Sequence, residues 1–217
     1  MKIEAVLFDC DGLMFDTEIV AQQIWRDEAY HYGITYPEDF FQQITGAGGR
    51  DNARYLASIE GMEDILPKIK EKRFDLEFWR SINTDCLNRK GLIEIFTYLE
   101  DNGYKIAICS SSSRAYVEAL IGTCSKKLHY DAIVCGDMVR HAKPDPEIFL
   151  RGAEEVGVKP ENCLVLEDSK QGILAAKRAC MHSCFIPDTI VPDEELQCDS
   201  LLDVIGLLEE SRKENER

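Results

Sequence analysis

The sequence predicts an α/β protein: a doubly wound parallel sheet of Rossmann-like type with a small helical cap domain inserted after the first strand. Short, continuously apolar runs alternate with amphipathic helical segments, as expected for strands that are buried on both faces of a parallel sheet. Residues 15–89 interrupt this alternation and far exceed the dozen or so residues that a parallel crossover needs. We therefore expect a core domain of residues 1–14 and 90–217 and a helical cap of residues 15–89.

Five apolar runs supply the predicted strands, and polar residues or turn residues follow each of them. The runs are IEAVLF, YKIAIC, DAIVC, CLVLE and HSCFI, and they end at Asp9, Ser110, Gly136, Asp168 and Pro187. Ligands of open parallel sheets bind beyond the carboxyl ends of the strands. A functional site is therefore expected where these runs end.

Helical patterns lie between the strands and fill the insert. In PEIFLRGAEEVG we predict a helix that starts at Pro146, with Asp145 as its N-cap and Gly157 after its last turn. The insert carries two apolar stripes at helical spacing, and the second predicts one longer helix. The first stripe is Ala21, Trp25, Ala29 and Tyr32, and the second is Ile65, Ile69, Leu76 and Trp79.

The charge balance argues against nucleic acid as a partner. The 217 residues carry 40 Asp and Glu against 25 Lys and Arg, a net charge of -15. Nucleic-acid phosphates are bound through surfaces rich in Lys and Arg. Any phosphate-bearing substrate must therefore bind at a local basic site on an acidic protein.

The cysteines and the amino-terminal residues predict a cytoplasmic location. The nine cysteines are scattered without a CxxC pair, so neither a zinc site nor a thioredoxin-like motif is expected. Free thiols are usual in a reducing compartment. The sequence MKIEAVLFD lacks the features of a signal peptide, and no apolar stretch approaches the ~20 residues of a membrane span. We expect no association with a membrane.

Reactive polar side chains gather at the predicted strand ends. Taken singly, each has an ordinary explanation: a D-x-D pair occurs by chance, serines cap helices, and a lone lysine is usually a surface charge. Together they form a set of four carboxylates, a hydroxyl cluster and one lysine. The set is Asp9, Asp11, Ser110 to Ser113, Lys143, Glu167 and Asp168.

Carboxylates that converge on one edge repel each other and favour a bound cation, and Mg²⁺ prefers oxygen ligands. A serine and a lysine nearby suit the remaining oxygens of a phosphoryl group. Gly12 would let backbone N–H groups approach a phosphate closely. We expect Asp9 and Asp11 to share a Mg²⁺ ion and a phosphate.

These residues resemble the four motifs of the haloacid dehalogenase superfamily. DCDGLMFDTE is similar to its first motif, Ser110 stands at the second, Lys143 in KPDPEIF at the third, and LEDSKQGILAAKRAC at the fourth. The resemblance covers residues 1 to about 190. The nearest branch is that of the β-phosphoglucomutase-like phosphatases, whose helical cap lies between the first two motifs, where this chain has its insert.

The resemblance implies a phosphatase mechanism. Asp9 would be the nucleophile that forms an aspartyl-phosphate, and Asp11 the general acid–base. Ser110 and the N–H of Ser111 would hold phosphoryl oxygens, and Lys143 would neutralise charge between Asp9 and the phosphate. Dehalogenases of the superfamily do not use a second aspartate in this way, so phosphoryl chemistry is favoured.

The resemblance also implies a Mg²⁺ site. Its ligands would be the Asp9 carboxylate, the Asp11 backbone carbonyl and Asp168. Glu167 would lie behind them or act as an occasional ligand. Family members with such caps are often monomers, and a monomer is expected here.

The cap should select the substrate, a small soluble phosphate ester such as a sugar phosphate, a nucleotide or phosphoglycolate. Candidate contacts are Thr17, Trp25, and Arg50 in the glycine-rich stretch TGAGGRD. Trp25 also lies on an apolar stripe, where core packing is the commoner role. The cap histidine of β-phosphoglucomutase would fall at Ala21, which favours a phosphatase over a mutase.

Three alternatives stay open. A β-phosphoglucomutase would share the same residues and would isomerise a sugar phosphate while releasing phosphate slowly. A phospho-accepting receiver domain also gathers acidic residues and a lysine, but it has no insert and places its lysine last; a stable phosphoform would support it. A catalytically inactive binding protein could use the same fold, and loss of activity in Asp9→Asn would argue against it.

Overall fold

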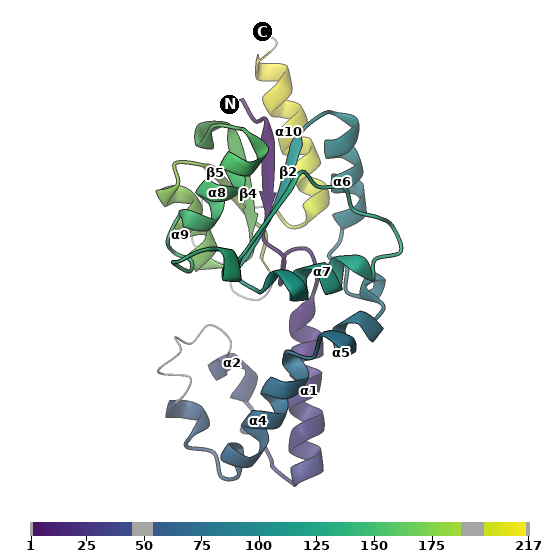
Figure 1. Ribbon diagram of the computed structural model, residues 1–217, viewed down its shortest axis with the longest axis vertical. Coiled ribbons are helices and arrows are strands. Elements are labelled where there is room, and N and C mark those ends of the chain that lie inside the picture. The colour runs from purple at the N-terminus through teal and green to yellow at the C-terminus, as the bar shows by residue number, and fades with distance from the viewer. Residues whose placement is uncertain (1, 45–53, 188–197, 216–217) are drawn as a thin grey trace. The chain divides into compact units, whose positions relative to one another are not determined.

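The computed structural model describes residues 2–44, 54–187 and 198–215 of the chain (Figure 1). The chain folds into two compact units. The core unit comprises Met1–Asp16 and Trp79–Arg217, and the helical unit comprises Thr17–Phe78. Among the described residues, no helix is both long enough and apolar enough to cross a membrane.

The core unit is built on a parallel sheet of five strands in the order β3-β2-β1-β4-β5. Each strand coincides with one of the predicted apolar runs, so the predicted fold class is confirmed. The strands are β1 (Ala5–Phe8), β2 (Lys105–Ser110), β3 (Ala132–Cys135), β4 (Cys163–Glu167) and β5 (His182–Phe185).

Helices cover both faces of this sheet, as the predicted double winding requires. In Figure 1, α8 and α9 lie on one side of the sheet and α6 and α10 on the other. The helices are α6 (Leu92–Asp101), α7 (Arg114–Gly122), α8 (Glu147–Val156), α9 (Lys170–Arg178) and α10 (Leu201–Asn215). Short 3₁₀ turns span Thr84–Cys86, Gly136–Met138 and Pro160–Asn162.

On the side of the sheet that α8 covers, the strand side chains are buried, which explains why the strand sequences are continuously apolar. Leu7 and Cys109 point into a buried cluster with Phe149 of α8, and none of the three is accessible to solvent. Burying a Phe or Leu side chain stabilises the fold by roughly 1.5–3 kcal/mol. A Cβ atom on Gly152 would lie 2.6 Å from the Cys109 sulfur, so glycine lets α8 approach the sheet closely.

Helix α8 begins one residue later than its sequence predicts. Pro146 occupies the N-cap position and the helix starts at Glu147. Asp145 still satisfies the helix start, because its Oδ1 accepts the Glu147 N–H at 3.0 Å. Gly157 ends the helix in the left-handed region at φ 70°, as expected.

The helical unit contains α1 (Thr17–Tyr32), α2 (Phe40–Ile44) and α4 (Met62–Arg73), and its interior combines aliphatic and aromatic side chains. Trp25 and Phe40 pack edge to face with ring centroids 5.3 Å apart. The Tyr36 hydroxyl donates to the Trp25 carbonyl oxygen at 3.0 Å. This unit therefore has a hydrophobic core of its own.

The single long helix predicted from Ile65 to Trp79 is wrong. The segment forms α4 and a separate helix, α5 (Leu76–Ser81). Asp75 Oδ1 accepts the N–H groups of Glu77 and Phe78, at 2.9 and 3.3 Å, and so starts a new helix. Apolar spacing alone could not reveal this interruption.

The boundaries of the two units differ from the expected ones, which fall after residues 14 and 89. Residues 79–89 group with the core unit because they contact it at several points. The Trp79 ring packs edge to face on Tyr116. Asp85 Oδ1 accepts the Ser125 N–H at 3.0 Å, and Arg89 Nη2 donates to the Pro187 carbonyl oxygen at 2.8 Å.

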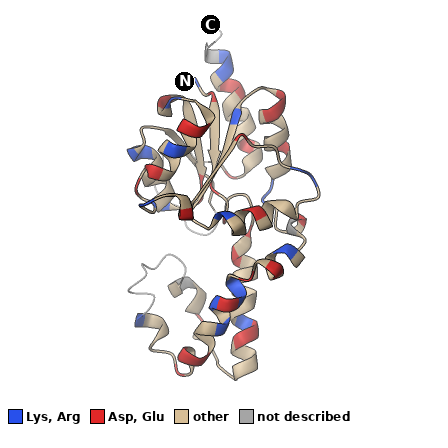
Figure 2. Cartoon of the chain, viewed as in Figure 1, with Lys and Arg blue, Asp and Glu red and all other residues tan. Residues whose placement is uncertain are grey.

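Charged side chains are distributed over the helices of both units. Figure 2 shows Lys and Arg interspersed with Asp and Glu. Over the whole sequence, the 40 acidic residues outnumber the 25 basic ones.

Candidate active site

The predicted site residues meet at the carboxyl edge of the sheet because the three central strands are in parallel register. Phe8 of β1 pairs with Ile108 of β2 and with Leu166 of β4. The residues that follow these positions therefore lie at one edge. The Asp9 N–H donates to the Leu166 carbonyl oxygen at 3.1 Å, which fixes the backbone at the start of the site.

Lys143 lies at the centre of the site. Its Nζ donates to Asp9 Oδ1, to Glu167 Oε1 at 2.6 Å and to the Cys109 carbonyl oxygen at 3.1 Å. An ammonium group has three N–H donors, so these three contacts use all of them. The side chain is only 6% exposed, which rules out the surface charge that a lone lysine would ordinarily be.

Glu167 anchors the turn after β4. Its Oε2 accepts the N–H groups of Asp168 and Ser169, at 3.1 and 2.9 Å, and the Ser169 hydroxyl at 2.8 Å. A Cβ on Gly172 would lie 1.8 Å from the Glu167 carboxyl carbon, so only glycine leaves room for this arrangement. Both Glu167 oxygens therefore already accept hydrogen bonds from the protein.

Gly12 makes space for Asp168. A Cβ on Gly12 would lie 2.0 Å from Asp168 Oδ2, and its φ of +79° is also unfavourable for other residues. The Gly12 N–H donates to the Phe15 carbonyl oxygen at 2.8 Å. Gly12 therefore has a steric role beside Asp168, and its own N–H is engaged within the loop. That Gly12 lets backbone N–H groups approach a phosphate stays a prediction.

Asp11 has surroundings different from those of Asp9. The Ser112 hydroxyl donates to Asp11 Oδ2 at 2.7 Å, and the Tyr116 hydroxyl donates to Asp11 Oδ1 at 2.9 Å. The sequence placed Ser112 in the serine cluster without giving it a partner, and it missed Tyr116 as a site residue. The serine run was visible, but nothing in the sequence indicates a contact between Tyr116 and a residue 105 positions away.

The serine loop after β2 is held against the end of β3. Ser110 is fully buried, and its Oγ accepts the Ser112 N–H at 3.0 Å. A Cβ on Gly136 would lie 2.1 Å from the Ser111 carbonyl oxygen, so the backbone of Ser111 packs directly on this glycine. Ser111 itself is exposed. The loop is thus positioned by its backbone.

The site holds more negative charge than Lys143 compensates. Burial raises the pKa of Asp9 to about 7, and Glu167 adds to this effect while Lys143 opposes it. Burial, Asp9 and Glu167 raise the pKa of Asp168 to about 9. Burial disfavours the Lys143 ammonium, but the two carboxylates it contacts outweigh that effect and raise its pKa. Such a site fits a divalent cation with oxygen ligands.

The three predicted cap residues have different outcomes. Thr17 is the buried first residue of α1. Trp25 is 6% exposed and packs in the apolar interior of the helical unit, which is the commoner role of a tryptophan on an apolar stripe. Arg50 lies outside the described residues. Ala21, where a mutase would carry histidine, is buried in α1.

A second set of potential metal ligands lies before α8. Single ligand atoms of His141, Asp145 and Glu147 lie within 4.8 Å of one another. The Glu147 carboxylate, however, accepts the N–H groups of Arg140 and His141. The three side chains therefore lie close together because they surround the start of α8, and these hydrogen bonds account for their arrangement without a metal.

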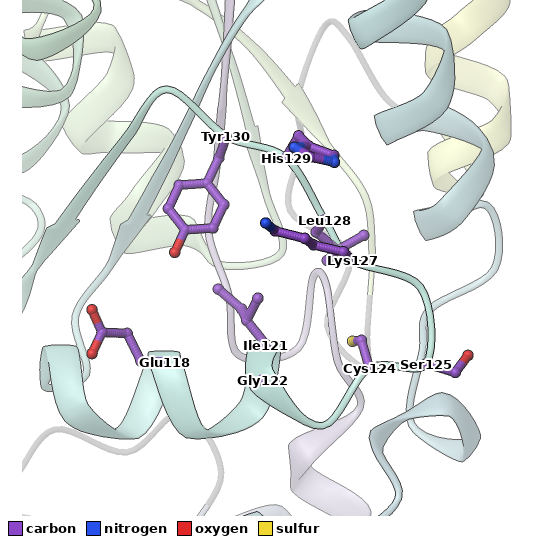
Figure 3. A pocket seen from close by; sticks show the side chains of 9 residues that line it. All are labelled: Glu118, Ile121, Gly122, Cys124, Ser125, Lys127, Leu128, His129 and Tyr130. Atoms are coloured by element: carbon purple, nitrogen blue, oxygen red, sulfur yellow. The ribbon is translucent and has the colours of Figure 1, made fainter.

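The core unit also has a cavity of about 620 Å³ between α7 and the segment that follows it (Figure 3). Glu118 lines it from the helix, and Lys127 and Tyr130 line it from the segment. None of its lining residues belongs to the strand-end site. This hollow is therefore not evidence for the chemistry at the strand ends.

Residues 6–186 match the family described as haloacid dehalogenase-like hydrolase. The match covers most of the chain and includes nearly all of the sheet. The chain belongs to this family of hydrolases.

Its relatives define the branch. A phosphorylated carbohydrates phosphatase of Thermotoga maritima is 33% identical over 177 residues, which are 82% of each chain. The fructose-1-phosphate phosphatase YqaB of Escherichia coli is 32% identical over 84% of this chain and 95% of its own. The crystal structure of a candidate beta-phosphoglucomutase from Thermotoga maritima has a TM-score of 0.78 at 26% identity and covers 96% and 99% of the two chains. The chain is a β-phosphoglucomutase-like phosphatase, as the motifs predicted.

Proposed function

We propose that this phosphatase hydrolyses a small phosphorylated carbohydrate with the help of Mg²⁺, through an aspartyl-phosphate formed on Asp9. One observation carries the proposal: the Asp9 carboxylate is held by the buried Lys143, while Asp11, two residues on, is held separately by two hydroxyl groups. Paired carboxylates in distinct surroundings suit a nucleophile and an acid–base. The names of the two curated relatives support a sugar phosphate as substrate.

In the first half-reaction, a carboxylate oxygen of Asp9 attacks the phosphorus atom. The bond from phosphorus to the sugar oxygen breaks, and its electron pair stays on that oxygen. The oxygen takes the proton of the Asp11 carboxyl group, so the sugar leaves as a neutral alcohol and Asp11 becomes a carboxylate. Splitting hydrolysis into two displacements lowers the barrier of each.

In the second half-reaction, water attacks the phosphorus of the aspartyl-phosphate. Asp11 takes a proton from that water, and the bond to Asp9 breaks with its electron pair returning to the carboxylate. Inorganic phosphate leaves, and Asp11 is again protonated for the next cycle. One water is consumed for each ester cleaved.

Positive charge and N–H donors would stabilise the transferring group. Lys143 lies beside Asp9 and would neutralise charge between Asp9 and the phosphate. Ser110, at the end of β2, and the backbone N–H of Ser111 would hold two of them. These assignments rest on the position of the serine loop and on the family resemblance.

The carboxylates of Asp9 and Asp168 and the backbone carbonyl of Asp11 would hold Mg²⁺, with Glu167 orienting the turn behind them. The raised pKa values of Asp9 and Asp168 support this assignment, and so does the space that Gly12 leaves for Asp168. Enzymes of this family generally use a divalent metal. Bound Mg²⁺ would neutralise negative charge on the carboxylates and the phosphoryl group.

We assign substrate selection to the helical unit, which stands in the sequence between β1 and β2 as a cap. Thr17 and Arg50 remain the candidate contacts. Trp25 is a weaker candidate because it packs in the interior of its unit.

The test is phosphate release from a panel of phosphorylated metabolites that includes fructose 1-phosphate and β-glucose 1-phosphate, with Mg²⁺ and with EDTA. We expect Mg²⁺-dependent release from a narrow group of sugar phosphates. Conversion of β-glucose 1-phosphate to glucose 6-phosphate without release would instead identify a mutase, the activity for which the similar crystal structure is named. Release from no ester, with a stable phosphoform, would point to a phospho-accepting switch.

A further inference from the structure

Two hydroxyl groups hold the Asp11 carboxylate, one on each oxygen. Ser112 donates to Oδ2 at 2.7 Å and Tyr116 donates to Oδ1 at 2.9 Å. The ammonium of Lys143 directs its three N–H groups to other acceptors. These two contacts on Asp11 come from neutral hydroxyl donors, whereas Lys143 forms an ion pair with Asp9.

Tyr116 is well placed to act as a fixed donor. It lies in the first turn of α7, directly after the serine loop. Its ring packs edge to face on Trp79, with centroids 5.1 Å apart and planes at 87°. Trp79 is only 2% exposed, so the surface behind the Tyr116 ring is part of the interior. A tyrosine side chain has only two torsion angles. Packing of its ring on a buried indole therefore restricts the position of the hydroxyl group.

We propose that Tyr116 is a positioning residue for the acid–base Asp11, acting together with Ser112; this inference rests on the proposed function. A general acid must point its proton at the leaving oxygen at the moment when the bond breaks. Hydrogen bonds on both carboxyl oxygens restrict rotation of the Asp11 side chain. They also stabilise the carboxylate that remains once the proton has been transferred.

The proposal predicts a dependence on the leaving group. An alkoxide or phenolate leaving group needs the proton of Asp11, whereas p-nitrophenolate is a much weaker base and leaves without it. kcat/KM reports the steps up to the formation of the aspartyl-phosphate, so it isolates the step in which Asp11 acts as an acid. Phenyl phosphate and p-nitrophenyl phosphate form a pair of probes that are close in shape.

For Tyr116→Phe we expect kcat/KM to fall about tenfold for phenyl phosphate and less than about twofold for p-nitrophenyl phosphate. KM should change little, because the ring and its packing on Trp79 are retained. Ser112→Ala should show the same selective loss. Asp11→Asn should show it most strongly and serves as the positive control.

Tyr104→Phe is the matched negative control. Tyr104 precedes β2 at the amino edge of the sheet, and its ring lies near that of Tyr98. Removing its hydroxyl should leave both kcat/KM values unchanged. The melting temperatures of all variants are measured, so that a loss of folding is separated from a loss of activity.

The outcomes separate this inference from the proposed function. Equal losses on the two esters, or no loss in both Tyr116→Phe and Ser112→Ala, would overturn the positioning role while the wild-type phosphatase activity stands. Should Tyr116→Phe fail to fold, Ser112→Ala decides alone. A wild-type enzyme that hydrolyses neither aryl ester nor any sugar phosphate would overturn the proposed function, and this inference with it.

Discussion

Each unit buries a carboxylate beside a lysine, and the two arrangements differ in what surrounds the lysine. In the helical unit, Glu28 of α1 is paired with Lys72 of α4, whose side chain is 49% exposed. In the core unit, Lys143 is 6% exposed and lies between Asp9 and Glu167. A partly solvated cation loses little hydration, whereas a fully buried charge cluster has a large desolvation penalty.

We infer from this difference that the Glu28–Lys72 pair is structural and that the Lys143 cluster is functional. Apolar residues of similar volume would often stabilise a protein core as well as a buried ion pair does, or better. Glu28 and Lys72 tie two helices together and need no further explanation. The cluster around Lys143 is costly for folding alone, and the proposed chemistry at Asp9 would explain its presence.

Asp9→Asn should abolish turnover, with a loss of at least about 10³-fold, because an amide oxygen is a poor nucleophile. The fold should survive, since Asn has the same shape and Lys143 keeps its bond to Glu167. Phosphate release and the melting temperature measure the two effects. Glu28→Gln is the matched control in the helical unit and should keep full activity. Near wild-type hydrolysis by Asp9→Asn would refute the aspartyl-phosphate.

Lys143→Ala should lower the rate at least tenfold and destabilise the protein by about 3–5 kcal/mol, because it leaves two buried carboxylates without their cation. The matched change Lys72→Ala should cost about 1 kcal/mol or less and leave the rate unchanged. Denaturant unfolding and phosphate release compare the two variants. Equal effects in the two units would remove the distinction between the pairs.

The sequence predicts the core unit well because topology determines where its polar residues meet. Continuous apolar runs identify the strands, and parallel register then brings Asp9, Ser110 and Glu167 to one edge. Apolar periodicity did not indicate a role for Lys143. The prediction for this residue came from the resemblance of KPDPEIF to a family motif. Its three hydrogen-bond partners could only be seen in the structure.

The sequence predicts less where contacts depend on helix packing. Apolar spacing continues across Asp75, so the break between α4 and α5 was invisible. Tyr116 lies on a helix whose surface pattern shows no reason for a polar contact with Asp11. Trp25 lies on an apolar stripe and is also a candidate substrate contact, and its burial favours the packing role.

Mg²⁺ should stabilise the protein more at pH 8.5 than at pH 5.5. The pKa of Asp9 is raised from 3.8 to about 7 and that of Asp168 from 3.8 to about 9. A raised folded-state pKa gives stability that is present below the unfolded value and is lost as pH rises through the folded value. The metal-free protein should therefore lose stability as pH rises through about 7 and 9.

Mg²⁺ bound at the proposed site would replace those protons, so its effect on the melting temperature should grow over the same pH range. Thermal unfolding with EDTA and with Mg²⁺ at the two pH values measures it. In Asp168→Asn the effect of Mg²⁺ should shrink. An equal shift at both pH values would mean that Mg²⁺ does not bind at these carboxylates.

The smallest expected effect on catalysis belongs to Trp25, in the interior of the helical unit. Trp25→Phe should lower stability by about 1–2 kcal/mol, because a smaller ring leaves space beside Phe40 and Tyr36. KM for the best sugar phosphate should change less than about twofold, since a core residue acts on the substrate only through the stability of its unit. Phe40→Leu is the matched control and should behave in the same way. A severalfold rise in KM at unchanged stability, in Trp25→Phe alone, would show that the indole contacts the substrate and that burial in the helical unit does not separate structural from functional residues.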